Sequence, residues 1–457
     1  MSGVLGRGYE KIDISSITSA IDPLSIADPE TLSLDEGIFV VSSLKNTPLR
    51  GPRHYEDSLY AACFSGDLID AQTVPWGDVT CIIREGNYKK FSEYNGFFAF
   101  ALFDKEKKDF YIVSDNFSLH PLYYYIKNEY VVFSTSISTF CRLKDPPVIN
   151  INWLYEYLYF SHPMSEATIL KSVYRMPPAS ILKYELKNSE ISLIEYGKRF
   201  QRAEKPLKGK DALEKALSVF EERVPKYFGC SDKFAHALTG GYDTRTVLSF
   251  VPEEMRDRMI TYTYGLIGSD DLIEALMIAK AANLPHMEIC FEDEFLNQLP
   301  DLIYETTYIS DGLENINRSY LPYVYRILTD NGQRFPIIIS GIAADAIFRG
   351  HAPSPHYISY DMKQVFTKGE KFIDKEFFGQ VFGDGFDDFS QYIDRVLDGM
   401  QDRYGEFGSL RTFFSFMLAK LLPRHFDGEA SVAGNFGAFR IPFLDQDLIQ
   451  LSCDIEY

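Results

Sequence analysis

Hydrophobic and polar residues alternate in short stretches through the first 150 residues, and this period of two predicts β-strands. We expect strands at 37–43, 97–103, 110–114 and 130–134. A further hairpin is expected over 180–196, with its turn at Lys187, Asn188 and Ser189. Short strands at this spacing, separated by polar turns, predict a layered antiparallel sheet domain.

The pattern changes near residue 205, after a basic linker that contains glycine. From there, apolar runs of strand length alternate with stretches of helix length. Strands are expected at 233–238, 260–264, 286–291 and 335–340, and helices at 211–224, from 242 onward and at 270–282. This alternation predicts an α/β fold with a parallel sheet covered on both faces, and beyond 355 a mainly helical part. We therefore divide the chain into 1–204 and 205–457.

The chain has 457 residues, with 46 Lys and Arg against 65 Asp and Glu, and a formal net charge of −19. Nucleic acids and anionic lipid surfaces attract clustered basic residues, so this balance argues against binding to either. No apolar run approaches the ~18 residues of a membrane-spanning helix, and the first residues lack the apolar core of a secretory signal. The six cysteines are isolated from one another, as is typical of a reducing compartment. We therefore expect the protein in the cytoplasm.

The most informative segment is ALTGGYDTR at 237–245, which joins a buried strand to a helix. Gly240 and Gly241 let backbone N–H groups approach an anion, and the start of the helix favours negative charge. The segment lacks the lysine of the Walker motif, so Asp243 would instead hold Mg²⁺ on phosphate oxygens. The alternative is a tight strand–helix turn with an acidic residue at the helix start.

A second segment, SGIAADAIFRG at 340–350, also follows a buried strand. Ligands of an open α/β sheet bind at the carboxyl ends of its strands. Asp243 and Asp345 would project from two such ends and could share one Mg²⁺ ion with a pyrophosphate. Taken alone, Asp345 also fits a residue that starts a helix.

Together these segments resemble the asparagine synthetase family. TGGYDTR is similar to the family's pyrophosphate loop, S-G-G-x-D-S-S, and SGIAADAIFRG to its second ATP loop, S-G-x-G-A-D-E-L-F-G-G. FRIPFLDQDL at 439–448 resembles the family's R-x-P-F-L-D, and DGEASVA at 427–433 resembles D-R-x-S-M-A. YNGFFAFALFD at 94–104, DNFSLHPLYYY at 115–125 and RMPP at 175–178 resemble segments of class II glutamine amidotransferases and the turn that follows them. The resemblance covers most of residues 60–457.

The resemblance implies an N-terminal Ntn-like αββα domain followed by a Rossmann-like ATP pyrophosphatase domain. It also implies that ATP activates a small-molecule or peptide carboxylate as an acyl-adenylate, that pyrophosphate leaves, and that an amine then forms the amide. The implied cofactors are ATP and Mg²⁺, with Asp243 and Asp345 as metal ligands and Arg245 and Arg349 as candidate phosphate contacts. The implied nucleotide site comprises Leu238, Thr239, Gly240, Gly241, Asp243, Thr244, Tyr264, Gly265, Ser340 and Gly341.

Several departures set this chain apart from the family. Ser2 stands where the family's nucleophilic cysteine is needed, and a serine hydroxyl is a weaker nucleophile. Ile342 stands where asparagine synthetases carry glutamate and β-lactam synthetases carry tyrosine, and Ala346 replaces a family glutamate. The sequence ends at Tyr457 with no lysine after Lys420, whereas family members carry a lysine beyond P-F-L-D. We therefore expect an inactive amidotransferase domain, as in β-lactam synthetases and lasso-peptide cyclases.

The sequence supports three hypotheses. The first is an ATP-dependent, asparagine synthetase-like ligase that forms an amide without glutaminase activity. The second is a non-catalytic nucleotide-binding or scaffold relative, motivated by Ile342 and Ala346. The third is a glutamine-hydrolysing asparagine synthetase, against which Ser2 argues. A homodimer, or a partner protein that completes the site, stays open.

Overall fold

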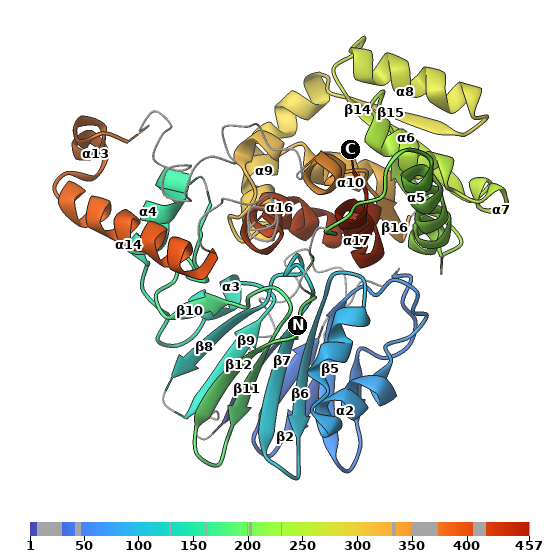
Figure 1. Ribbon diagram of the computed structural model, residues 1–457. Helices are drawn as coiled ribbons and strands as arrows, with labels where there is room; N and C mark the ends of the chain where they lie inside the picture. The colour runs from blue at the N-terminus through green and yellow to red at the C-terminus, as the bar shows by residue number, and fades with distance from the viewer. Residues whose placement is uncertain are drawn as a thin grey trace.

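The chain folds into two antiparallel sheets and one parallel sheet, as a computed structural model shows (Figure 1). The structure describes residues 1–6, 30–41, 47–127, 129–160, 162–198, 200, 203–229, 231–330, 335–349, 373–404 and 417–456. In these residues no helix is long and apolar enough to cross a membrane.

The N-terminal half is a sandwich of two six-stranded antiparallel sheets. The first has the order β10-β8-β9-β1-β3-β2, with bounds Val173–Arg175, Tyr123–Lys127, Tyr130–Ser134, Ser2–Gly6, Gly37–Val41 and Glu30–Leu34. The second has the order β12-β11-β7-β6-β5-β4, with bounds Glu190–Glu195, Ser180–Glu185, Asp109–Ser114, Phe98–Asp104, Tyr60–Gly66 and His54–Glu56. The strands predicted in this half and the hairpin around Lys187 to Ser189 are confirmed.

Three apolar layers hold this half together. Leu5, Phe39 and Phe133 of the first sheet meet Phe103 and Phe110 of the second in the core between the sheets. The outer face of the second sheet packs on α2 (Trp76–Glu85), and the outer face of the first packs on α3 (Ser138–Cys141). The order helix, sheet, sheet, helix is the αββα arrangement that the resemblance implied. Because β6 is covered on both faces, its sequence is apolar from Phe98 to Phe103 rather than alternating, and only its last residue, Asp104, is polar.

The C-terminal half is built on a five-stranded parallel sheet of order β15-β14-β13-β16-β17. The strand bounds are His286–Cys290, Met259–Gly265, Phe234–Ala237, Ile337–Ile339 and Ala438–Arg440. One face packs on α9 (Asp293–Ile309), α10 (Leu321–Asp330) and α16 (Leu422–Gly434). The other packs on α5 (Gly209–Arg223), α6 (Tyr242–Ser249), α8 (Asp270–Ala281) and α17 (Gln446–Asp454). The predicted α/β fold with both faces covered is confirmed.

Two element ends show how proline shapes this half. Helix α5 ends at Arg223, two residues before Pro225, and the chain continues as a 3₁₀ turn over Val224–Phe228. The strand predicted at 335–340 is ordered as a strand only over Ile337–Ile339. The strand begins after Pro336 because proline has no N–H group to donate to a neighbouring strand. The carbonyl of Pro336 still accepts a hydrogen bond from the N–H group of Ala438.

A small group of helices lies to one side of the sheets (Figure 1). It consists of α4 (Ile151–Phe160), α13 (Lys375–Phe382) and α14 (Phe386–Tyr404), which share an apolar core of their own. Helix α4 precedes residue 205 and the other two follow it, so the two halves of the chain are interleaved here. The boundary after residue 204 stays a prediction.

Candidate functional site

The two glycine-containing segments follow neighbouring strands of the parallel sheet. Strand β13 pairs with β14 on one side and with β16 on the other, and both pairings are parallel. The chain runs outward from β13 to β14 and β15, and then returns to place β16 and β17 on the opposite side. The direction of winding therefore reverses between β13 and β16, which is where open α/β sheets bind ligands.

The first loop is a tight turn that hydroxyl groups stabilise. The N–H group of Thr239 donates to Thr244 Oγ1 at 3.2 Å, and that of Gly241 donates to Thr239 Oγ1 at 3.2 Å. Helix α6 begins at Tyr242, so Asp243 lies in its first turn. His236, fully buried in β13, lies with Nε2 3.0 Å from the carbonyl oxygen of Thr244. Burial lowers the pKa of His236 to about 4, so the imidazole that contacts the carbonyl of Thr244 is neutral.

The second loop lies directly against the first. The N–H group of Ser340 donates to the carbonyl of Arg440 at 3.0 Å, and that of Ile342 donates to Ser340 Oγ at 3.3 Å. A side-chain carbon added to Gly341 would lie only 2.9 Å from the backbone nitrogen of Thr244. Glycine at 341 is therefore required for the two loops to touch.

Asp243 and Asp345 begin the helical segments that follow these two loops. Asp345 starts the short π-helical segment Asp345–Arg349 and is exposed, whereas Asp243 is half-buried. No group of three or more histidines, cysteines and carboxylates gathers to hold a metal in the part of the chain that is described. Mg²⁺ usually takes one or two carboxylates and completes its shell with phosphates and water, so carboxylates are suitable ligand types. The role of Asp243 and Asp345 as metal ligands stays a prediction.

The end of β14 forms the other border of the first loop. Leu238 is buried in the core beneath the loop, and its carbonyl accepts a hydrogen bond from Thr263 Oγ1. The ring of Tyr264 packs against Tyr320 and Phe291, with centroids 5.2 Å and 6.1 Å away. Burial raises the pKa of Tyr264, so its phenol stays neutral. Gly265 ends the strand beside this aromatic group.

Comparison with known proteins decides the family. The asparagine synthase family profile matches residues 219–457, which is more than half of the chain, and a glutamine amidotransferase domain profile matches 79–196. The chain belongs to the asparagine synthase family. A putative glutamine-hydrolysing asparagine synthetase of Methanocaldococcus jannaschii is 24% identical over 60% of this chain and 48% of its own length. Asparagine synthetase 1 of Bacillus subtilis, which is glutamine-hydrolysing, is 21% identical over 66% of this chain and 49% of its own length. The chain spans about half the length of these relatives.

One solved structure is a more distant comparison. A glutamine phosphoribosylpyrophosphate amidotransferase of B. subtilis, complexed with ADP and GMP, has 9% sequence identity and covers 65% of this chain and 69% of its own. Its TM-score is 0.29, which is too low to bear on the fold or the site.

Of the two arginines predicted to bind phosphate, the structure describes the side chain of Arg245 but not that of Arg349. Arg245 Nε donates to the carbonyl of Gly241 at 3.1 Å, and its guanidinium lies 4.6 Å from the ring centroid of Tyr242. Its positive charge therefore stays beside the first loop. The side chain of Arg349 lies outside the described residues. The roles of both arginines stay predictions.

Ala343 is a feature of the second loop that sequence reasoning missed. It has φ = 73°, in the left-handed region, at the position where the asparagine synthetase motif carries glycine. An L-residue pays about 1–2 kcal/mol there because its Cβ crowds the following carbonyl. We expect Ala343→Gly to raise the free energy of unfolding by about 1 kcal/mol in urea denaturation. Ala344→Gly is the matched control, because the neighbour has no such φ, and it should lower stability instead. Equal losses in both variants would contradict this explanation.

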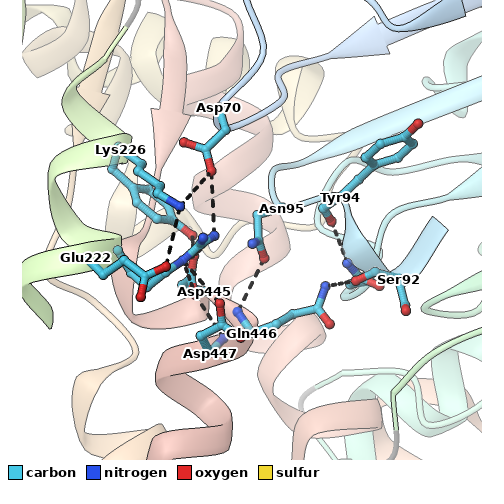
Figure 2. Close-up of polar contacts among 12 residues, drawn as sticks. Asp70, Ser92, Tyr94, Asn95, Glu222, Lys226, Asp445, Gln446 and Asp447 are labelled. Atoms are coloured by element: carbon cyan, nitrogen blue, oxygen red, sulfur yellow. Dashed lines mark hydrogen bonds and ion pairs between the residues drawn. The ribbon is translucent and has the colours of Figure 1, made fainter. Parts of the chain in front are cut away.

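Charged residues of the R-x-P-F-L-D segment form buried ion pairs in this asparagine synthase family member, and Figure 2 shows those around Asp445. Arg440 is buried and pairs with Asp67 of the N-terminal half through Nε at 2.7 Å and Nη2 at 3.3 Å. Arg223 Nη2 donates to Oδ2 of the fully buried Asp445 at 2.9 Å. The same nitrogen lies 3.7 Å from Asp70 Oδ2. Arg440 therefore joins the two halves through Asp67, and Asp445 holds Arg223 close to Asp70 of the N-terminal half.

Ser2 is a buried residue of the N-terminal half. It is fully buried in β1, and its hydroxyl oxygen lies 2.6 Å from Ser134 Oγ and 3.4 Å from Thr139 Oγ1. The residue therefore belongs to a buried cluster of three hydroxyl groups between β1, β9 and α3.

A pair of carboxylates beside Tyr320 was not predicted from the sequence. Glu314 and Glu429 are buried, and Arg318 lies between them with Nη1 3.8 Å and 2.9 Å from their Oε2 atoms. Glu314 Oε2 has no hydrogen-bond donor among the described residues. Burial raises the pKa of Glu314 from 4.5 to about 7. Only the fold brings these residues together, because they come from the α9–α10 connection and from α16.

This pKa shift predicts a pH dependence of stability. Well below pH 4.5 Glu314 is protonated in both the folded and the unfolded state, so it does not change the stability with pH. As the pH rises from 4.5 to 7 the unfolded state loses this proton first, so folding becomes less favourable, by on the order of 2 kcal/mol once the pH exceeds 7. We expect Glu314→Gln to reduce the stability difference between pH 5 and pH 8, measured by urea denaturation. The control is Glu294→Gln on the exposed part of α9. A variant with the wild-type pH profile would contradict the assignment.

Proposed function

We propose that this protein is an ATP-dependent amide-forming ligase that adenylates a carboxylate and releases pyrophosphate. The observation that carries the proposal is the contact between Gly341 and Thr244, which places the two loops of the family's nucleotide motifs side by side at the reversal point of the sheet. The family membership supports the same conclusion.

The proposed reaction has two steps. A carboxylate oxygen of the substrate attacks the α-phosphorus of ATP, and the bond to the β-phosphate oxygen breaks. An amine nitrogen then attacks the acyl carbon, AMP leaves, and the amine loses its proton. In the first step negative charge grows on the departing pyrophosphate. Pre-positioned donors stabilise such charge best, because they need no reorganisation during the reaction.

The chain's own groups suit the first step. The backbone N–H group of Gly240 and the start of α6 would form a cradle for the pyrophosphate, beside the turn that Gly241 and Thr239 close with their hydrogen bond. Arg245 adds a positive charge beside this cradle. Mg²⁺, held by Asp243 and Asp345, would neutralise phosphate charge when bound. The aromatic group around Tyr264 gives the adenine an apolar border.

We further propose that the amine comes from the substrate rather than from glutamine. The burial of Ser2 and its bond to Ser134 support this, because a nucleophile must reach the amide carbon that it attacks. We also propose a cytoplasmic location, which the free thiols of Cys63, Cys81, Cys141, Cys290 and Cys453 support.

A non-catalytic relative is the second candidate. It is favoured by Ile342 and Ala346, which pack against the apolar core and give the second loop no group that can move a proton. On this alternative the protein binds ATP without turning it over.

The test is to incubate the full chain with ATP, Mg²⁺, hydroxylamine and a panel of carboxylic acids and peptides. Hydroxylamine replaces the unknown amine, so an acyl-adenylate is trapped as a hydroxamate. We expect equal amounts of pyrophosphate, AMP and hydroxamate with at least one acid, and no glutamate from added glutamine. ATP binding without any product would support the non-catalytic relative. Absence of ATP binding would overturn both.

A further inference from the structure

Glu274 reaches from α8 onto the first glycine loop. A side-chain carbon added to Gly240 would lie 1.6 Å from Glu274 Oε2, 2.7 Å from its Cδ and 3.0 Å from its Cβ. The same carbon added to Gly241 would meet only Thr239 Oγ1, at 3.2 Å. The carboxylate therefore fills the space that glycine leaves open at residue 240.

Glu274 lies directly beside the loop that the proposed function takes as the phosphate site. Glycine at such a position lets an anion approach the loop's N–H groups, and here the nearest anion belongs to the protein itself. Glu274 is exposed on the first turns of α8, so it can rotate into solvent without breaking the core. A ligand can therefore displace the side chain from the loop at little cost.

The charges around the loop decide which ligands can displace this carboxylate. Asp243 and Asp345 follow the two loops, and Arg245 donates a hydrogen bond to the carbonyl of Gly241 in the first loop. A metal-free phosphate adds further negative charge beside Glu274 and is repelled. A phosphate that carries Mg²⁺ is largely neutralised, so the repulsion is small.

We propose that Glu274 makes the loop selective for metal-complexed phosphates over metal-free ones. This inference rests on the proposed function, because it takes the first loop as the phosphate site. Glu274 acts as a specificity-determining residue. Its carboxylate lies against Gly240 at the edge of the cradle in the free protein and yields to a metal-bound nucleotide, while metal-free nucleotides and free pyrophosphate are repelled by it.

The test compares the wild type with Glu274→Gln and Glu274→Ala in the full chain. Isothermal titration calorimetry measures the affinity for inorganic pyrophosphate in EDTA, for ATP in EDTA, and for ATP with excess Mg²⁺. Glu254→Gln is the matched control. It removes the same charge from an exposed residue of α7 (Glu253–Arg256). The loop precedes α6, whereas α7 follows it, so Glu254 lies at the other end of that helix.

We expect Glu274→Gln to bind metal-free pyrophosphate and metal-free ATP about tenfold more tightly, because a nearby like charge is gone. The affinity for ATP with Mg²⁺ should change by less than about threefold, and Glu254→Gln should match the wild type. Unchanged metal-free binding in both Glu274 variants would overturn the inference. So would weaker binding of ATP with Mg²⁺ in Glu274→Gln, which would make Glu274 a metal ligand. If the wild type binds Mg²⁺–ATP but the Glu274 variants keep the wild-type preference for metal-bound nucleotide, the inference on Glu274 fails and the proposed function stands. A wild type that binds no nucleotide overturns both.

Discussion

Replacing Asp243 with asparagine is expected to lower the rate of pyrophosphate release by on the order of 10²-fold or more, because it removes charge that would hold Mg²⁺ on the leaving group. Asp243 lies in the first turn of α6, directly after the glycine turn. Asparagine keeps the size of the side chain and can still accept hydrogen bonds, so the local fold should survive. The measurement is the initial rate of pyrophosphate formation with the acid identified by hydroxamate trapping.

A binding measurement separates this effect from a general loss of activity. Asp243→Asn should weaken the affinity for ATP in the presence of Mg²⁺ and have little effect on the affinity for ATP in EDTA. Asp257→Asn is the control, because Asp257 is an exposed carboxylate of the same half that follows α7. A variant that binds Mg²⁺–ATP and releases pyrophosphate at the wild-type rate would remove Asp243 from the site.

The elements around the loops follow from local sequence rules. An apolar run that ends in Thr239, Gly240 and Gly241 predicts a strand, a tight turn and a helix start, and the structure has β13, the turn and α6 in that order. Parallel strands place their carboxyl ends at one edge of the sheet, so the neighbourhood of the two loops was also predictable.

The contacts that shape the site were not predictable in the same way. Glu274 meets Gly240 across 34 positions of the sequence, and Arg318 reaches Glu429 only because α16 packs beside the α9–α10 connection. Periodicity shows which face of a helix is buried, but it does not show which exposed carboxylate lies over which glycine. The φ angle of Ala343 was also hidden, because the sequence shows alanine where the backbone favours glycine.

The pair between Arg440 and Asp67 has the largest expected effect on stability. Both side chains are buried, and the carboxylate accepts two hydrogen bonds from the guanidinium, at 2.7 Å and 3.3 Å. Arg440 Nη1 also donates to the carbonyls of Tyr227 at 2.7 Å and Gly229 at 3.3 Å. Arg440→Met would leave the charge of Asp67 buried without its partner. We expect the free energy of unfolding to fall by about 3–5 kcal/mol in guanidinium chloride denaturation.

The double variant tests whether the pair or the arginine alone is responsible. Adding Asp67→Asn to Arg440→Met removes the stranded charge, so it should recover part of the lost stability, and the coupling energy of the cycle gives the interaction. The control pair is Lys105 with Glu56, which lie 2.7 Å apart but are partly exposed. Lys105→Met should lower the stability by less than about 1 kcal/mol, because water screens an exposed pair. The two halves of the chain meet at Arg440 and Asp67, so losing this pair should also lower the cooperativity of unfolding. A single sharp transition with wild-type stability in Arg440→Met would show that the halves are held together by other contacts.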